Sequence, residues 1–397
     1  MPRRILLTCS DANSLRNFRG CLIASLRHDG HEVVAIAPDF PTDIAQWCDE
    51  LGVAMERTNL DNQSLSPLKD LAALAQIYRI VRRSRPDVVM GYTHKPALYT
   101  AFAAKLAAVP HVTMMVTGIG SGFEPGKGLL RSLVPAITRA LFRIGCAVSD
   151  TVIFHNKDNR DFFIAEKLLK DSGKAVVVGG SGVDLSYFQP QPPAASAAPD
   201  NITFLLIARI VRYKGILEYA RAAEALRGRY PEAKFLLAGY HDSNPLAYSN
   251  DEWRFIQDQV DYLGPIKDVR PLYRRAHVYV LPSYGEGMPR TVLEAMASAR
   301  PIVTTDTYGC RDTVEDGVNG YLVPTRDWRS LATAMEQFLA GRSSLSGMGR
   351  ASLERVRSLF DVETVNRQMF AALGVDWESS ERAAGKTRLV RRRGFAP

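Results

Sequence analysis

The chain has 397 residues, of which 46% are hydrophobic and 23% are charged, with 29 glycines and 22 prolines. This composition excludes disordered, collagen-like and low-complexity chains, and the length predicts two domains that each bury a core. The formal net charge of +8 permits a polyanionic partner, either nucleic acid or an anionic membrane, and does not distinguish between them.

The 5 cysteines are scattered, with no C-x-x-C pair and no histidine cluster at zinc-like spacing. This pattern indicates reduced thiols in a cytoplasmic protein without a structural metal. At the amino terminus only Ile5-Leu6-Leu7 follows the basic residues, which is too short for a signal-peptide core. No run approaches the roughly 18–20 apolar residues of a membrane-spanning helix, so we expect neither export nor a transmembrane anchor.

Short runs rich in valine and isoleucine alternate with amphipathic helical stretches in the first half of the chain. The predicted strands are Arg4–Thr8, Glu32–Ala37, Ala54–Thr58, Asp87–Tyr92, His111–Val116, Thr151–Phe154 and Ala175–Val178. Helices are predicted at Arg16–His28 and Leu68–Arg83. This alternation predicts a parallel sheet with helices on both faces. It stops at Gln189–Asp200, where four prolines among small residues indicate a linker or exposed loop.

The same alternation resumes in the second half. The predicted strands are Ile202–Ala208, Lys234–Gly239, Tyr262–Gly264, Val278–Pro282 and Pro301–Thr305, and the helices are Gly215–Arg227, Arg290–Ala299, Trp328–Leu339 and Asp361–Leu373. The chain is therefore predicted to hold two doubly wound α/β halves, which bind ligands beyond the carboxyl ends of their strands. The final segment Arg382–Pro397 is basic without an acidic residue and is predicted to be a disordered arm.

The most informative motif is Ser283–Ala295, SYGEGMPRTVLEA. A predicted strand ends before it, a glycine-flanked turn carries Glu286, and Pro289 precedes a helix whose first amides can hold an anion. Glu294 follows eight residues after Glu286, inside the helix, so a diphosphate with its ribose and sugar can be held at two points. The alternative is that both glutamates are solvated and the glycines only shape a turn.

This stretch matches the E-x7-E region of the retaining glycosyltransferases of family 4. The resemblance continues through Ala299–Val303 and Glu315–Val323. It implies a GT-B fold: two facing Rossmann-like doubly wound domains with an interdomain cleft. It also implies transfer of a sugar from a nucleotide-sugar donor, in which Glu286 positions the donor sugar and stabilises an oxocarbenium ion and Glu294 holds the ribose hydroxyls. The resemblance further implies that the intervening residues Gly287, Met288 and Pro289 bind the donor.

Two cations support this interpretation. Arg209 follows the first strand of the second half, and Lys214 precedes the next helix. In the family that this sequence resembles, the matching residues hold the donor diphosphate, and fixed cations there stabilise the charge that develops on the leaving group. Without the glutamate motif, they are equally consistent with surface cations at a helix start.

His94 directly follows a predicted strand of the first half, in Tyr92-Thr93-His94-Lys95-Pro96. A histidine there is either a structural hydrogen-bonding residue or, as in related enzymes, a catalytic group near the donor sugar.

The segment Thr117–Phe123 superficially resembles a dinucleotide fingerprint, but the third glycine position is Phe123 and the motif follows a late strand. We interpret it as an acceptor loop, with an ordinary turn as the alternative. The loop after the first strand is a second candidate. The predicted acceptor residues are Asn13, Ser14, Arg19, Lys95, Gly118 and Gly120.

No aspartate pair has the D-x-D spacing of the metal clamp found in the other major glycosyltransferase architecture. We therefore expect no metal and no cofactor beyond the nucleotide-sugar donor, which we expect to be UDP-linked, with the diphosphate neutralised by Arg209, Lys214 and helix amides.

A basic stripe lies beside a broad apolar face between residues 127 and 144. Its members are Lys127, Arg131, Arg139 and Arg143, and Pro135 is predicted to kink or divide the helix. The pattern is typical of a helix that lies on an anionic membrane surface, and equally of a packed helix with its basic edge in water. Together with Arg391, Arg392 and Arg393 of the arm, these residues are our membrane-contact candidates.

Within the family, the sequence is similar to bacterial enzymes that extend undecaprenyl-diphosphate-linked sugars, such as the N-acetylgalactosaminyltransferases of protein N-glycosylation. The motifs behind this similarity are Leu15–Arg19, Thr93–Pro96, Thr117–Gly120 and Glu286–Pro289. We therefore expect a UDP-sugar donor, a polyprenyl-diphosphate-linked acceptor and peripheral attachment to the inner face of the cytoplasmic membrane.

The predicted domains are an acceptor-binding domain at 1–185, a nucleotide-sugar-binding domain at 186–360, a helix at 361–374 that crosses back to the first domain, and a basic tail at 375–397. The alternative functions are a UDP-sugar 2-epimerase of the same fold and a basic nucleic-acid-binding protein. The glycosyltransferase interpretation expects no nucleic-acid partner.

Overall fold

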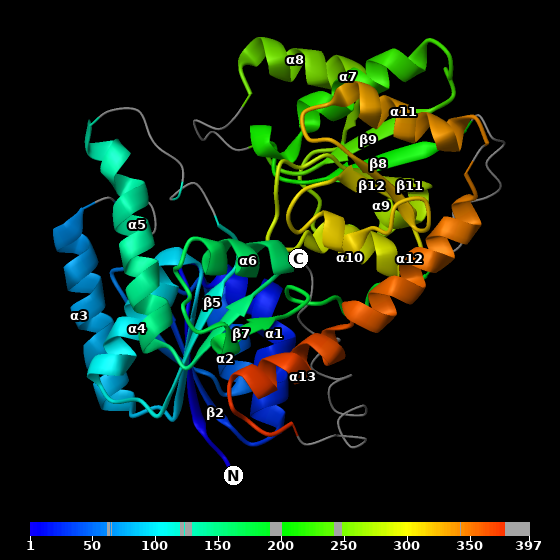
Figure 1. Cartoon of the computed structure of the whole chain (residues 1–397). Coiled ribbons are helices and arrows are strands. Elements are labelled where there is room, and N and C mark those ends of the chain that lie inside the picture. Colours follow the sequence, from blue (N-terminus) through cyan, green and yellow to red (C-terminus); the bar gives the residue numbers. More distant parts are fainter. Residues whose placement is uncertain are drawn as a thin grey trace. The chain divides into compact units, whose positions relative to one another are not determined.

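In the computed structural model of this chain, the described residues are 1–61, 64, 66–119, 123, 129–190, 201–241, 248–341 and 343–377, without the side chains of 129–132. The predictions for Gly120, Lys127, Arg391, Arg392, Arg393 and the side chain of Arg131 lie outside them. The chain forms two compact units (Figure 1). Unit 1 contains residues 1–181 and the described residues from 365 onward, and unit 2 contains residues 182–364.

Unit 1 is built on a seven-stranded sheet in the order β3-β2-β1-β4-β5-β6-β7. Every neighbouring pair is parallel. The strands are β1 (Arg4–Thr8), β2 (Glu32–Ala37), β3 (Ala54–Arg57), β4 (Val88–Tyr92), β5 (His111–Val116), β6 (Thr151–Phe154) and β7 (Ala175–Val177). The central strands are almost wholly buried, which explains their unbroken apolar runs.

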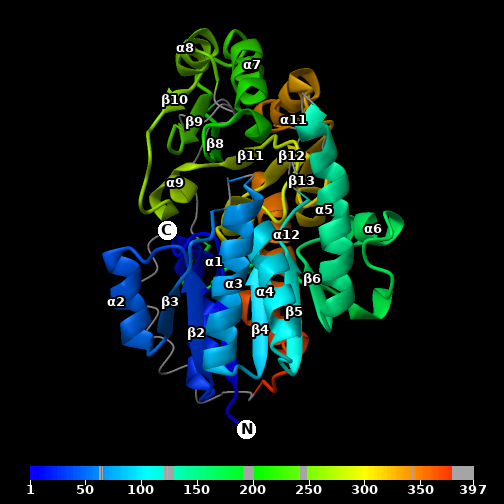
Figure 2. The same cartoon turned by 90° about the vertical axis from the view of Figure 1, so that its left-hand side faces the viewer.

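Helices cover both faces of this sheet. They are α1 (Asn13–His28), α2 (Thr42–Leu51), α3 (Pro67–Ser84), α4 (His94–Leu106), α5 (Leu129–Val148) and α6 (Lys157–Ala165). Figure 2 shows α3, α4 and α5 side by side over one face. Gly91 permits α4 to lie close to β4, because a Cβ there would come within 2.3 Å of the Pro96 carbonyl oxygen. The α5 helix is continuous through Pro135, so this proline does not divide it.

Unit 2 contains a six-stranded parallel sheet in the order β10-β9-β8-β11-β12-β13. Its strands are β8 (Thr203–Ile207), β9 (Lys234–Ala238), β10 (Asp261–Tyr262), β11 (Val278–Leu281), β12 (Ile302–Thr305) and β13 (Gly320–Val323). Its helices are α7 (Ile216–Arg227), α8 (Asn250–Gln259), α9 (Arg270–Arg275), α10 (Arg290–Ala297), α11 (Trp328–Leu339) and α12 (Leu345–Leu359). Apolar clusters fill both faces of the sheet.

The helix α13 (Val362–Ala372) begins in unit 2 and ends in unit 1. Its Val365, Met369 and Phe370 are part of the apolar core of unit 1. The Ala372 carbonyl oxygen accepts hydrogen bonds from His111 Nε2 at 3.1 Å and Thr113 Oγ1 at 3.4 Å. These contacts fasten the end of the helix to β5. The division between the units falls at 181/182, four residues before the predicted domain boundary at 185/186.

Candidate functional site

Two loops at the carboxyl ends of adjacent strands in unit 2 are held together. One follows β8 and contains Tyr213 and Lys214, and the other follows β11 and contains Ser283–Pro289. The Tyr284 amide donates to the Tyr213 carbonyl oxygen at 2.8 Å. Gly215 has φ +70°, and a Cβ there would lie 2.0 Å from the Pro282 carbonyl oxygen. Glycine is therefore required at this position for both backbone conformation and space.

This arrangement brings Glu286 to Lys214, as an ion pair of 2.5 Å between Oε1 and Nζ with both side chains largely buried. The loop after β12 supports Glu286 from a third strand: the Glu286 amide donates to the Tyr308 carbonyl oxygen at 3.1 Å. A Cβ on Gly285 would come within 2.1 Å of the Tyr308 ring. Glu286 is therefore positioned by three loops, each at a strand end.

Tyr213 joins the two predicted cations. The exposed Arg209 donates to the Tyr213 hydroxyl, and its guanidinium carbon lies 5.9 Å from the ring centroid. Lys214 Nζ lies 5.2 Å from the same centroid. The aromatic ring thus holds two positive charges at one end of the sheet. Tyr213 was not predicted from the sequence, although it lies between Arg209 and Lys214 in the chain.

Glu294 lies in a different environment from Glu286. It is buried in α10, where Oε1 accepts from Arg290 Nε at 2.9 Å and Oε2 accepts from the Tyr273 hydroxyl at 3.0 Å. Burial raises the pKa of the Glu294 carboxyl, and Arg290 and Tyr273 oppose that shift. Pro289 precedes α10 as predicted, and Gly287 and Met288 are partly buried in the loop between the two glutamates.

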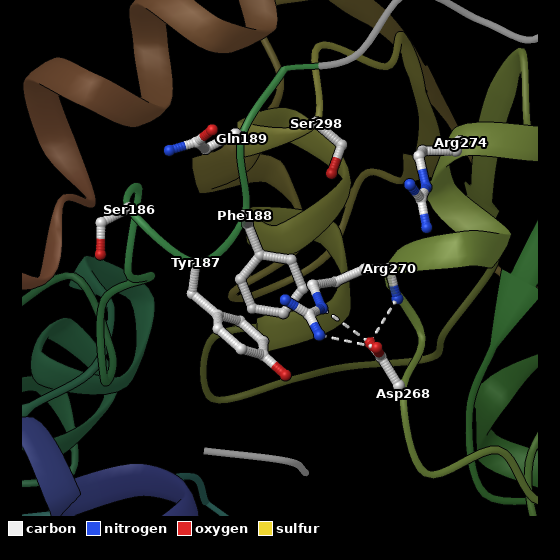
Figure 3. Close-up of a pocket in the computed structure, with 8 residues that line it drawn as sticks. All are labelled: Ser186, Tyr187, Phe188, Gln189, Asp268, Arg270, Arg274 and Ser298. Carbon is white, nitrogen blue, oxygen red and sulfur yellow. Dashed lines mark hydrogen bonds and ion pairs between the residues drawn. The ribbon is translucent and has the colours of Figure 1, made fainter. Parts of the chain in front are cut away.

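A pocket of ≈ 310 Å³ in unit 2 is lined by residues that the sequence analysis did not select: Ser186, Tyr187, Phe188, Gln189, Asp268, Arg270, Arg274 and Ser298 (Figure 3). Arg270 is paired with Asp268 at 2.7 Å and stacks over the Tyr187 ring at 4.0 Å from its centroid. Phe188 packs against Tyr273 with 6.1 Å between ring centroids. The pocket therefore borders the aromatic partner of Glu294.

In unit 1, His94 is the first residue of α4, and only Thr93 separates it from the end of β4. Its Nε2 lies 3.0 Å from the Gly118 carbonyl oxygen, and its ring packs edge-on against Phe142 with 5.6 Å between centroids. His94 therefore connects the end of β4 with the loop after β5, where Gly118 was predicted to lie near an acceptor. Thr93 has φ +69°, which is a strained backbone conformation for a residue other than glycine. Such strained residues cluster at functional sites.

The loop between β1 and α1 lies next to this strand end. Ser14 Oγ is 2.8 Å from the Tyr92 hydroxyl, and Ser10 Oγ is 3.2 Å from Thr93 Oγ1. Asn13 donates from its backbone and its side chain to Asp11 Oδ1, both at 3.0 Å. The structure thus brings the predicted acceptor residues Asn13 and Ser14 to the edge that carries His94.

Lys95 is fully engaged in a structural role. Its Nζ donates to the Asp61 and Ser64 carbonyl oxygens at 3.0 and 2.5 Å and to Asp70 Oδ1 at 2.7 Å. These three contacts use all three ammonium donors. Lys95 therefore holds Asp61, Ser64 and Asp70, and these contacts leave no ammonium donor for its predicted acceptor role.

Comparison with known protein families identifies both units. A model described as "Glycosyl transferase 4-like domain" matches residues 20–178, and one described as "Glycosyl transferases group 1" matches residues 201–341. The chain belongs to this glycosyltransferase family. The family predicted from the E-x7-E region is confirmed.

Curated relatives of this glycosyltransferase include two enzymes that act on lipid-linked sugars. It is 27% identical over 336 residues to N,N'-diacetylbacillosaminyl-diphospho-undecaprenol alpha-1,3-N-acetylgalactosaminyltransferase of Campylobacter jejuni, covering 82% of this chain and 86% of the relative. It is 26% identical over 285 residues to UDP-Gal:alpha-D-GlcNAc-diphosphoundecaprenol alpha-1,3-galactosyltransferase of Escherichia coli, covering 69% and 71%.

Solved structures show the fold of this glycosyltransferase. A glycosyltransferase from Rickettsia africae matches with a TM-score of 0.74 and 18% identity, over 93% of this chain and 97% of that one. Anabaena HepE, in complex with UDP and glucose, matches with a TM-score of 0.72 and 18% identity, over 94% and 99%. The fold class is GT-B, as predicted. The comparisons do not support the alternative of a UDP-sugar 2-epimerase.

The helix α5 of the glycosyltransferase exposes an apolar stripe. Leu133, Ile137 and Ile144 are 53%, 56% and 53% exposed. Arg139 of the predicted basic stripe pairs with Glu166 at 2.9 Å, and Arg143 Nε donates to the Lys167 carbonyl oxygen at 3.1 Å. Two basic side chains of α5 are therefore bound to neighbouring residues, whereas the apolar side chains of its stripe are exposed to solvent.

Within the described part of the chain, no group of three or more histidine, cysteine, aspartate or glutamate side chains is arranged to hold a metal ion.

Proposed function

We propose that this glycosyltransferase moves a sugar from a UDP-sugar to an undecaprenyl-diphosphate-linked saccharide during bacterial glycan or polysaccharide assembly, with retention of configuration. The donor sugar in this proposal is GalNAc, GlcNAc or a related hexose. The observation that carries it is the Glu286–Lys214 pair at the carboxyl ends of β8 and β11, with Arg209 beside it. The names of the Campylobacter and Escherichia relatives support a lipid-linked acceptor, and the UDP complex of HepE supports a UDP-linked donor.

The proposed chemistry follows from the positions of these charges. As the bond between the anomeric carbon and the diphosphate breaks, negative charge develops on the leaving oxygen, and Arg209 and Lys214 stabilise it. Glu286 uses one of the three Lys214 protons, so the ammonium retains donors for the diphosphate. The Glu286 carboxylate stabilises positive charge on the sugar ring. Glu294 holds the ribose hydroxyls, and His94 assists at the donor sugar.

Retention needs the acceptor oxygen to form its new bond on the face that the diphosphate leaves. In the proposed step the acceptor hydroxyl bonds to the anomeric carbon, and its proton passes to the departing phosphate oxygen. This route needs no enzymic nucleophile, because the leaving group itself serves as the base.

The function is tested by offering a panel of radiolabelled UDP-sugars together with bacterial undecaprenyl-diphosphate-linked sugars. We expect UDP release and labelled lipid only when both substrates are present. Conversion of the UDP-sugar into an isomer without any acceptor contradicts the proposal and indicates epimerisation.

We also propose that this transfer is independent of metal ions, because Arg209, Lys214 and helix amides supply the positive charge at the diphosphate. We expect the initial rate in EDTA to equal the rate in untreated buffer. A rate abolished by EDTA and restored by manganese rules this out.

We propose that the protein docks on the inner face of the cytoplasmic membrane, whose surface is anionic. The helices α3 and α5 both pack against α4 (Figure 2). Each of them exposes leucine or isoleucine side chains. On α3, Leu68 and Leu71 are 80% and 63% exposed, in the half of the helix nearest its start. We define the apolar patch as Leu68, Leu71, Leu133, Ile137 and Ile144. Among the described residues, no helix combines the length and apolar character needed to cross a bilayer.

We expect Ile137→Glu to reduce sedimentation with vesicles that contain anionic lipid by about tenfold, because it removes an apolar side chain from the contact and adds a negative charge. Leu359→Glu on α12 is the matched control, since Leu359 is also an exposed helical residue, at 45%. Equal sedimentation of Ile137→Glu and the wild type contradicts docking through this patch.

A further inference from the structure

Tyr284 lies two residues before Glu286 and makes contacts that the proposed chemistry does not use. Its hydroxyl donates at 2.7 Å to Oε1 of Glu218, which lies in the first turn of α7. Its ring lies beneath Arg326 of the loop after β13, whose guanidinium carbon is 4.8 Å from the ring centroid. Tyr284 therefore connects the loop that carries Glu286 to two other elements of unit 2.

The contact between Tyr284 and Glu218 lies beside the Glu286–Lys214 ion pair in the sequence of both segments. Lys214 and Glu218 flank the start of α7, and Tyr284 and Glu286 are two residues apart in the loop after β11. Two side-chain contacts, of 2.7 Å and 2.5 Å, thus attach this loop to the start of α7. A change at Tyr284 therefore acts on the segment that places Glu286 against Lys214.

The Tyr284 hydroxyl remains a donor to the Glu218 carboxylate at physiological pH. Burial raises the pKa of Tyr284, and the Glu218 carboxylate raises it further, so the hydroxyl keeps its proton. Among the described residues, Glu218 Oε2 is buried without a hydrogen-bond partner, so the carboxylate depends on Tyr284 for its side-chain hydrogen bond. Removing the donor from such a carboxylate is unfavourable, which keeps the two residues joined.

Arg326 adopts a strained backbone conformation. Its φ is +61°, in the left-handed region that glycine adopts readily and arginine does not. In the described part of the chain no carboxylate pairs with its guanidinium, which lies over the Tyr284 ring. Strained residues of this kind cluster at functional sites. The presence of arginine here therefore indicates that its cation–π contact with Tyr284 serves the site.

We propose that Tyr284 positions Glu286 for the transfer reaction, and that Glu218 on α7 and Arg326 after β13 hold Tyr284 in place. This inference rests on the proposed function for the role of Glu286 at the sugar ring. Tyr284, Glu218 and Arg326 are positioning residues, because they act through Glu286.

Steady-state kinetics of Tyr284→Phe test this positioning, because phenylalanine keeps the ring beneath Arg326 and removes only the hydroxyl. We expect kcat to fall about tenfold and the KM for the UDP-sugar to stay within about twofold of the wild type, since Glu286 acts on charge that develops during the reaction. Tyr230→Phe is the matched control. The Tyr230 hydroxyl also donates to a carboxylate, Glu336 Oε1 at 3.0 Å, and an arginine lies over its ring, but it lies between α7 and β9.

The Tyr230→Phe control should have the kcat of the wild type. Wild-type kcat in Tyr284→Phe contradicts the proposal. So does a raised KM at unchanged kcat, which indicates that Tyr284 binds the donor directly.

A double-mutant cycle shows whether Tyr284 acts through Glu286. We expect Tyr284→Phe to lower kcat about tenfold in the wild type and less than about twofold in Glu286→Gln, because the glutamine lacks the charge that Tyr284 positions. A loss caused by general destabilisation is the same in both backgrounds. Equal losses therefore overturn the proposal.

Arg326→Gly tests the second support of Tyr284. Glycine adopts φ +61° without strain, so the variant is expected to fold, with kcat lowered about fivefold because the ring loses its cation. Arg326→Lys keeps a positive charge and should retain most of the activity. Arg85→Gly is the matched control, since Arg85 is also an arginine with positive φ, +44°, at the end of α3 in unit 1. Equal kcat in Arg326→Gly and Arg85→Gly rules out a role for Arg326.

Amide hydrogen exchange tests the support of the loop without any substrate. The Tyr284 amide donates to the Tyr213 carbonyl oxygen at 2.8 Å, and the Glu286 amide donates to the Tyr308 carbonyl oxygen at 3.1 Å. We expect both amides to exchange faster in Tyr284→Phe and at the wild-type rate in Tyr230→Phe. If the wild type transfers no sugar to a lipid-linked acceptor, the proposed function fails, while exchange still decides whether Tyr284 holds the loop. Wild-type exchange in Tyr284→Phe contradicts the proposal.

Discussion

Replacing Glu286 by glutamine is expected to lower kcat by about 10²–10³-fold, the usual loss when an electrostatic stabiliser of the transition state is removed. The amide nearly preserves the size of the side chain and still offers an oxygen to Lys214, which the carboxylate contacts at 2.5 Å. The negative charge is lost. Because that charge acts most strongly when the sugar ring becomes positive, the KM for the UDP-sugar should remain within about twofold of the wild type.

Steady-state kinetics with the donor varied and the acceptor saturating measure this prediction. Glu252→Gln is the matched control. Glu252 also forms an ion pair with a cation of the β8 loop, Arg212, which is two residues before Lys214. Glu252 itself lies on α8, outside the proposed site. Its kcat should equal that of the wild type. If Glu286→Gln retains wild-type kcat, Glu286 does not stabilise the transition state.

The sheets were predictable because buried parallel strands are continuous apolar runs. The predicted strands Arg4–Thr8 and His111–Val116 have the observed bounds. The strand β13 was not predicted, since Gly320–Val323 is short and begins with glycine. That glycine is needed for packing: a Cβ on Gly320 would come within 1.8 Å of the Ile302 carbonyl oxygen. A requirement set by a neighbouring strand cannot be derived from local sequence.

The helix α12 shows the same limitation. Its sequence includes Gly347 and Gly349, and glycine has a low helix propensity. A Cβ on Gly349 would lie 2.3 Å from the Ala299 carbonyl oxygen, so the close packing of α12 near the end of α10 favours glycine there. Tertiary packing outweighs the local preference, and this helix was not among the predicted ones.

One part of the candidate site was predictable because its residues lie together in one sequence motif. Glu286, Glu294 and Arg290 lie within a single loop and helix, and the family resemblance supplied Lys214. The contacts of Lys95 and of the buried Arg19 were not predictable, because they depend on partners far away in the sequence: Asp70 for Lys95 and His155 for Arg19. A sequence identifies a cation without showing whether a carboxylate reaches it.

Replacing Glu294 by glutamine is expected to weaken UDP binding by about 10–100-fold, while kcat at saturating donor changes little. The expected loss corresponds to about 1.5–3 kcal/mol, the contribution of hydrogen bonds between ribose hydroxyls and a charged acceptor. The ribose does not react, so this binding energy is the same in the ground state and the transition state. Calorimetric titration with UDP measures the affinity, and the kinetic assay measures kcat.

The stability of Glu294→Gln must be separated from its affinity, because Glu294 is buried and paired with Arg290 at 2.9 Å. Tyr273→Phe provides the comparison: it removes the hydroxyl that donates to Glu294 Oε2 at 3.0 Å but keeps the carboxylate charge. Both variants are expected to lower the melting temperature, whereas only Glu294→Gln should lose most of its affinity for UDP. If the UDP affinities of the two variants fall in proportion to their melting temperatures, Glu294 affects UDP binding only by stabilising the fold. If Glu294→Gln binds UDP as the wild type does, the ribose contact is absent.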